Sequence, residues 1–95
     1  MKACILVAGT VSEVTPAFLE LVATSARKQG LEGYIARHTA HDPQGFKIIL
    51  CGMKDRTDIF LDELHELGAV HGLHDVQISP FAQDKDYRGA FRVVV

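Results

Sequence analysis

"VAGTVSEVTPAFLEL", residues Val7–Leu21, decides the fold prediction for this chain. An apolar strand runs into Gly9, a short polar loop follows, and a helix is predicted to begin at Pro16 with Thr15 as its N-cap. A strand, a glycine turn and a helix N-terminus together often form a phosphate-binding cradle. Glu13 and Pro16 argue against that use here, because Glu13 adds negative charge and Pro16 has no backbone N–H.

The rest of the chain alternates between strand and helix patterns. The first helix is predicted to end at Gly30, and a second helix to begin with Asp55 or Thr57 as its N-cap and to end at Gly68. Strands are predicted at 3–8, 34–39, 46–51, 76–79 and 90–95, with a turn at 41–45 and a polar loop at 80–89. This order predicts an α+β, ferredoxin-like βαββαβ sandwich, with two helices on one face of a four- to five-stranded antiparallel sheet. The other face of the sheet is expected to stay open.

Length and composition restrict the function classes. Ninety-five residues predict a single domain, 1–95, and the formal net charge of −2 argues against nucleic-acid binding. No apolar run approaches the roughly 20 residues of a membrane span, and the N-terminus reads as a strand rather than a signal peptide. Two cysteines are too few for a secreted disulfide scaffold, so we expect a cytoplasmic protein. Five histidines lack the cysteines or carboxylates that would complete a metal site, and we expect no metal and no cofactor.

Several motifs follow one another in the order found in a known enzyme family. Gly9, Val11 and Val14 fit the motif G-x-V-Q-G-V-x-F-R at the right spacing. The segment GLEGYIAR, residues 30–37, is similar to G-x-x-G-x-V-x-N, and YRGAFRVVV, residues 87–95, is similar to the closing segment of the same proteins. By this order the chain resembles the acylphosphatase family over nearly its whole length. The resemblance implies the acylphosphatase type of ferredoxin-like fold.

The residues that carry the chemistry of that family are changed in this chain. In the family, the arginine of the first motif binds the phosphoryl group together with loop N–H groups, and the asparagine of the second motif orients the attacking water. Ala17 and Arg37 stand at these two positions, and Glu13 replaces a glycine. Glu13 would repel an anion at about 4 Å by about 1 to 4 kcal/mol, depending on the dielectric. The resemblance therefore implies a degenerate anion loop, made up of Thr10, Val11, Ser12, Glu13, Val14, Thr15 and Ala17.

Strand alternation predicts which side chains lie on the open face. The first and third strands are expected to be antiparallel neighbours, with Ile5, Val7, Ile48 and Leu50 toward the helices. A candidate interface is then left on the open face, made up of Cys4, Leu6, Ala8, Ile49 and Cys51. The two cysteines are expected to be cross-strand neighbours with free thiols, and the alternative is a disulfide or a metal-binding pair. The alternative is that the C-terminal segment or the hairpin tip covers this strip.

Three functional hypotheses remain open from the sequence. The leading one is a non-catalytic acylphosphatase-like domain that acts by binding or self-association, as a homodimer or with a protein partner. The second is a weak or altered acylphosphatase in which Arg37 or Arg27 replaces the missing arginine, although we expect Arg37 to pair with Glu13 or to face solvent. The third is a sensor that uses the degenerate anion loop to bind a small ligand other than phosphate.

Overall fold

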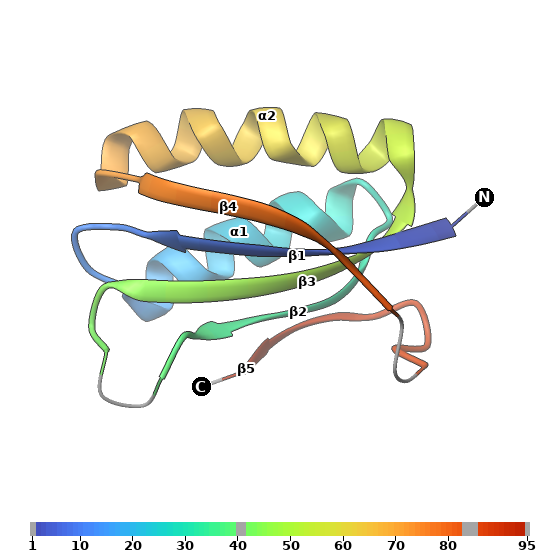
Figure 1. Ribbon diagram of the computed structural model, residues 1–95, viewed down its shortest axis with the longest axis horizontal. Helices are drawn as coiled ribbons and strands as arrows, with labels where there is room; N and C mark the ends of the chain where they lie inside the picture. Colours follow the sequence, from blue (N-terminus) through green and yellow to red (C-terminus); the bar gives the residue numbers. More distant parts are fainter. Residues whose placement is uncertain (1, 40–41, 83–85, 95) are drawn as a thin grey trace.

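Seven elements follow one another in the predicted order. The computed structural model describes residues 2–39, 42–82 and 86–94 (Figure 1). The elements are β1 (Lys2–Thr10), α1 (Pro16–Lys28), β2 (Glu32–Arg37), β3 (Gly45–Met53), α2 (Lys54–His71), β4 (His74–Phe81) and β5 (Phe91–Val94). Both helices lie on one face of the sheet, as predicted for a ferredoxin-like sandwich. Neither helix is long and apolar enough, within the described residues, to cross a bilayer.

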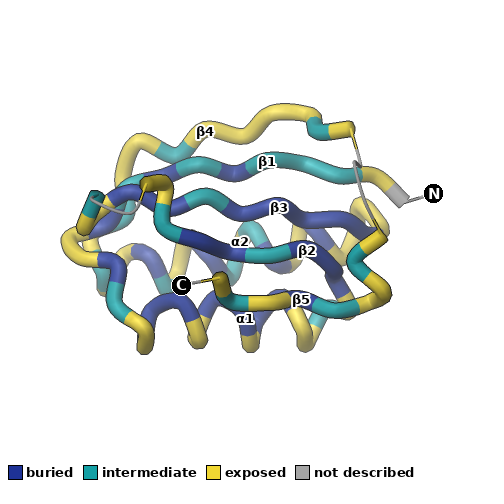
Figure 2. The backbone as a smooth tube through the Cα atoms, turned by 90° about the horizontal axis from the view of Figure 1, so that it is seen from below, coloured by how far each residue is buried: buried dark blue, intermediate teal, exposed yellow. Residues whose placement is uncertain are grey.

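The sheet has five strands in the order β4-β1-β3-β2-β5 (Figure 2). The pairs β1–β3, β1–β4 and β2–β3 are antiparallel, whereas β2 and β5 are parallel. The prediction of a purely antiparallel sheet is therefore wrong. The difference arises because β4 and β5 lie at opposite edges, so that β5 joins the far side of β2 and runs in the same direction.

The register of the central strands agrees with the predicted alternation. Ile5 pairs with Leu50 and Val7 with Ile48. The side chains of all four belong to, or pack against, the core on the helix side of the sheet. The hydrophobic core lies between this side and the helices, and it is closed by residues of both helices, notably Phe18, Leu19, Val22, Phe60 and Leu64. Figure 2 shows β3 buried along most of its length at the centre and β4 largely exposed at one edge.

The start of α1 follows the predicted capping pattern. Thr15 has an extended backbone, its Oγ1 accepts a hydrogen bond from the Phe18 N–H at 3.1 Å, and Pro16 occupies the first helical position. Gly30 follows the helix with a left-handed φ of 69°. The prediction that this segment forms a capped helix is confirmed.

The predicted limits of α2 are wrong at both ends. Neither Asp55 nor Thr57 is the N-cap: the helix begins after Met53, and the Thr57 hydroxyl donates to the Met53 carbonyl. The helix also continues through Gly68, whose buried Cα lies so close to Leu73 that a Cβ there would overlap the leucine side chain. Gly68 therefore serves packing, and the helix ends one turn later at Gly72, with φ 74°.

Most of the remaining boundaries differ by a few residues from the predicted ones. β2 begins at Glu32 and ends at Arg37, two residues before the predicted limits at both ends, because its pairing with β3 starts opposite Cys51. β4 runs from His74 to Phe81 and includes Pro80, which the sequence placed in a loop. A proline is tolerated there because β4 is an edge strand.

The helices are joined by a partly buried polar contact. The Ser25 hydroxyl donates to Glu63 Oε2 across the α1–α2 interface, and Lys28 lies 3.6 Å from Glu63 Oε1. The Ser25 hydrogen bond lowers the pKa of the Glu63 carboxyl. This contact fixes the relative position of the two helices with a directional interaction.

Cys4 and Cys51 form a disulfide, so the expectation of free thiols is wrong. The two residues are Cα partners on β1 and β3, with their Cα atoms 4.1 Å apart, which confirms that they are cross-strand neighbours. They are separated by 47 positions in the sequence. Disulfides persist mainly in oxidising compartments, so this bond removes one of the grounds for expecting a cytoplasmic protein.

The disulfide predicts a measurable loss of stability on its removal. Closing a loop of this length restricts the unfolded chain, which corresponds to about 2 to 4 kcal/mol in the free energy of unfolding. We expect the Cys4→Ala/Cys51→Ala variant to lose an amount in this range in urea unfolding, and the parent to lose a similar amount under reductant. The variant itself should not respond to reductant. Equal stability of the parent with and without reductant would contradict the bond.

Candidate functional site

The loop between β1 and α1 is the predicted anion site, and its backbone is engaged within the chain. The Val11 N–H donates to the Gln44 carbonyl at 3.0 Å, and the Val14 N–H to the Pro43 carbonyl at 2.7 Å. The Ser12 N–H donates to the carbonyl of His71, at the end of α2, at 2.8 Å. An anion cradle requires free N–H groups that point at the ligand. Three donors of this loop are already bonded to carbonyls of the protein.

The side chains of the loop agree with this closed arrangement. Val11 and Val14 are buried in the core, while Ser12 and Glu13 are exposed. The Thr10 end of β1 contributes to the wall of a shallow hollow at the hairpin end of the open face. The loop therefore packs its apolar side chains inward and leaves a negative charge outside.

The N-terminus of α1 offers little to an anion. Thr15 accepts the Phe18 N–H through its side chain, and Pro16 has no N–H to donate. Ala17 is exposed and takes the place where the resemblance implies an arginine. The usual attraction of a helix N-terminus for an anion is thus weakened at three successive positions.

The hairpin tip that closes the loop is held by Asp42. Its Oδ1 accepts the N–H groups of Gln44 and Gly45, each at 2.9 Å. The Gln44 and Gly45 N–H groups, followed by the nearby His38, lower the pKa of the Asp42 carboxyl. These bonds position the Pro43 and Gln44 carbonyls that accept the loop N–H groups.

Arg37 lies near the loop but on the far side of a buried ring. Arg37 pairs with Phe46, and Phe46 pairs with Gly9, so the three residues form one row across β2, β3 and β1. The Phe46 ring lies over Gly9, since a Cβ on this glycine would meet the end of that ring. The ion pairs found among the described residues do not include the suggested pair of Arg37 with Glu13.

Arg27, the other suggested replacement, lies at the opposite end of α1. It is eleven positions beyond Pro16, which is about 16 Å along a helix. Its Nε donates to the Phe91 carbonyl at 3.0 Å, and its guanidinium lies 3.6 Å from Glu20. Arg27 therefore ties α1 to β5, far from the loop.

The histidines do not come together as a metal site in the described part of the chain. No group of three or more histidine, cysteine, aspartate or glutamate side chains lies close enough there to hold a metal ion. His38 and Asp42 line the shallow hollow at the hairpin end, and His71 stacks edge-on against Phe18 at 5.2 Å. His41 lies outside the described residues.

The predicted interface strip is on the open face, as the register requires, but two of its five residues are buried. Ile49 is 2% exposed and Cys51 is fully buried, although neither belongs to the helix-side core. Cys4, Leu6 and Ala8 are partly exposed. The alternative that the C-terminal part of the chain covers this strip is supported by Tyr87, whose ring contacts Tyr34 on the open face at 6.2 Å.

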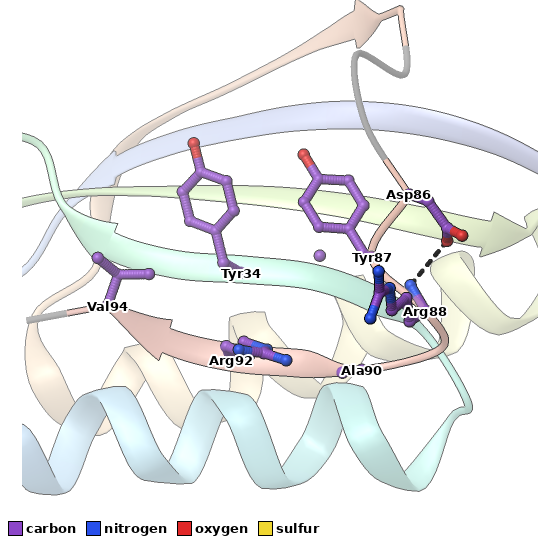
Figure 3. A pocket seen from close by; sticks show the side chains of 8 residues that line it. Tyr34, Asp86, Tyr87, Arg88, Ala90, Arg92 and Val94 are labelled. Carbon is purple, nitrogen blue, oxygen red and sulfur yellow. Dashed lines mark hydrogen bonds between the residues drawn. The ribbon is translucent and has the colours of Figure 1, made fainter.

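The sequence did not predict a second hollow. It lies at the β2–β5 edge of the open face and has a volume of about 360 Å³ (Figure 3). Tyr34, Tyr87, Arg88 and Arg92 line it. The alternation of β2 places Tyr34 on the open face. Tyr87 and Arg88 lie in the predicted polar loop, 80–89, where no periodic pattern indicates which way their side chains point.

Comparison with known proteins agrees with this architecture. No family model matches the chain, and neither does any curated protein. An acylphosphatase from Coxiella burnetii is 24% identical, with a TM-score of 0.81 over 98% of this chain and 93% of that one. An acylphosphatase from Bacillus subtilis is 15% identical, with a TM-score of 0.82 over the full length of both. Full-length HypF, in a phosphate- and nucleotide-bound form, matches at 17% identity and a TM-score of 0.79, over all of this chain and 12% of HypF.

These likenesses confirm the predicted fold class, and they show that the chain has the acylphosphatase fold. The sheet of that fold is mixed in this chain, as its parallel β2–β5 pair shows.

The closed loop predicts that restoring two side chains will not restore anion binding. We expect the Glu13→Gly/Ala17→Arg variant to bind inorganic phosphate only weakly, with a dissociation constant above about 1 mM, because the N–H groups of Val11, Ser12 and Val14 stay bonded to the protein. Amide NMR shifts during a phosphate titration would measure this. A dissociation constant below about 1 mM in the double variant, which corresponds to about 4 kcal/mol, would show that the loop opens readily.

Proposed function

We propose that this chain is a non-catalytic domain of the acylphosphatase fold that acts by binding through the open face of its sheet. The observation that carries the proposal is the bonding of the Ser12 and Val14 N–H groups to carbonyls of the chain itself. Phosphoryl transfer to water depends on positioning and on stabilising the developing charge. With the loop donors engaged and Ala17 in place of arginine, both contributions are missing from this loop.

Electrostatics supports the same proposal. Glu13 is exposed at the loop and would face an incoming anion. The next positive groups along the chain after the loop, Arg27 and Lys28, lie at the other end of α1. A substrate with a dianionic phosphoryl group would therefore meet repulsion at the loop rather than attraction.

The competing proposal is a weak or altered acylphosphatase that uses Arg37. The likeness to two acylphosphatases favours it, and so does the position of Arg37 in the same row as Gly9. The Phe46 ring over Gly9 and the engaged loop donors count against it. The same engaged donors count against a sensor that would use the cradle for another small ligand.

Self-association through the predicted strip is a form of binding with less support. Ile49 and Cys51 are buried within the chain, so the apolar area left to a second copy or a protein partner comes from Leu6 and Ala8 and their neighbours. A stable interface usually buries about 800 Å² on each partner. A homodimer or a protein partner on this face therefore stays a proposal, and such a partner would have to contact residues beyond the predicted strip to bury an area of this size.

An assay of acyl-phosphate hydrolysis tests the proposed function directly. We expect the purified protein to leave the rate of hydrolysis of a generic acyl phosphate near its uncatalysed value, because the loop lacks a positive clamp and the N–H groups of Val11, Ser12 and Val14 are bonded to carbonyls of the chain. The Arg37→Ala and Arg27→Ala variants should not differ from the parent. Turnover that Arg37→Ala abolishes and Arg27→Ala retains would establish the altered acylphosphatase instead.

A further inference from the structure

The hollow at the β2–β5 edge brings together aromatic and cationic side chains. Figure 3 shows Tyr34 and Tyr87 side by side, with both rings on the side of β2 that faces away from the helices. Their centroids lie 6.2 Å apart, with ring planes inclined at 49°. These two residues are the only tyrosines of the chain, which contains no tryptophan.

The sheet register places a guanidinium beside this aromatic pair. Arg92 on β5 is the Cα partner of Tyr34 on β2, so their side chains lie on the same face of the sheet. Its neighbours Phe91 and Val93 point to the core, which confirms that Arg92 points to the open face. Arg92 is exposed, and Val94 continues the same wall.

A tight turn brings a second guanidinium to the rim. The Ala90 N–H donates to the Tyr87 carbonyl at 3.0 Å, and both central residues are left-handed, with φ of 55° at Arg88 and 70° at Gly89. Asparagine and glycine favour such a turn, whereas a long side chain at positive φ is uncommon. Arg88 therefore holds an unfavourable backbone conformation, a feature that is often found at binding sites.

The turn is anchored by a carboxylate below it. The Gly89 N–H donates to Oε2 of Glu32, which is 4% exposed, at 2.7 Å, and the Arg88 N–H donates to Oδ1 of Asp86 at 2.8 Å. The Gly33 N–H donates to the Ala90 carbonyl at 2.9 Å. Gly33 itself, at φ 134°, lies so close to β3 that a Cβ would overlap the Ile49 carbonyl oxygen. The turn is thus fixed before any ligand arrives, which lowers the entropy lost on binding.

We infer that this hollow binds a small aromatic anion of mononucleotide size, whose ring packs against the pair Tyr34 and Tyr87 and whose phosphate or carboxylate lies on Arg88 and Arg92. Tyrosine rings stack on planar groups, and guanidinium groups present donors that match phosphate and carboxylate oxygens. Among the described residues that line the hollow, the exposed charges are two arginines against Asp86, because Glu32 is buried under the turn. A volume of about 360 Å³ lies in the range of small-ligand pockets.

The inference rests on the proposed function, because it names a ligand class for the open face, but its test does not depend on the hydrolysis assay. Turnover of an acyl phosphate would overturn the non-catalytic proposal and leave this site intact. Failure of the site would leave the closed loop as it is. The two outcomes are measured on different residues.

The test is an NMR titration with adenosine monophosphate, followed through the tyrosine ring signals. Since Tyr34 and Tyr87 are the only tyrosines, both sets of ring signals report on this hollow. We expect both to shift, with a dissociation constant at or below about 1 mM. Adenosine and inorganic phosphate, titrated separately, should each bind at least tenfold more weakly than the nucleotide.

Variants separate the site from a general charge effect. Arg88→Gln and Arg92→Gln should each weaken nucleotide binding by about three- to tenfold, whereas Arg56→Gln on α2 makes the same charge change and should leave it unaltered. Arg88→Asn should weaken binding and raise the unfolding temperature, because asparagine tolerates the left-handed conformation. A merely structural role for Arg88 would not give that opposite pair of effects.

Three results would overturn the inference. One is the absence of any tyrosine shift at millimolar nucleotide. Another is an equal effect of Arg56→Gln and the two site variants. The third is binding of a single-stranded oligonucleotide without binding of the mononucleotide, which would identify a nucleic-acid surface instead.

Discussion

The pairing of β1 with β3 is the constraint on which both faces of the sheet depend. Val7 lies opposite Ile48, and Leu6 lies opposite Ile49. Because side chains alternate along a strand, a slip of one residue would exchange the core with the open face. The helices cover the face that carries Val7. The disulfide and the residues of the hollow, Tyr34, Tyr87, Arg88 and Arg92, lie on the opposite, open face.

The same pairing also closes the predicted anion loop. Thr10, the last residue of β1, is the Cα partner of Gly45, the first residue of β3. This brings the hairpin tip, with the Pro43 and Gln44 carbonyls, beside the segment that follows Thr10. The loop N–H groups then find acceptors within the chain, as buried backbone donors generally do. The closure of the cradle is therefore linked to the register of the sheet as well as to the replaced side chains.

Local signals predicted the fold better than they predicted the site. The cap of α1, the element order and the alternation on β1 and β3 follow from short-range patterns, and the structure agrees with each. Gly68 was misassigned because a glycine that ends a helix and a glycine that admits Leu73 look the same in sequence. The disulfide was misjudged because the register predicted the proximity of Cys4 and Cys51, while their oxidation state was inferred from an expected compartment. The hollow was missed because Arg88 occupies a turn position where the usual signal is asparagine or glycine.

The loop between β1 and α1 and the hollow at the β2–β5 edge differ in the charge of the side chains that they present to a ligand. At the loop, backbone N–H groups are bonded to carbonyls, and the exposed side chain is that of Glu13. At the β2–β5 edge, the backbone N–H groups of the turn are bonded to Asp86 and Glu32, but the exposed side chains are those of Arg88 and Arg92. Backbone donors are engaged at both places, so the side chains decide the sign of the local field. An anion would be repelled at the first place and attracted at the second, and the tyrosines lie only at the second.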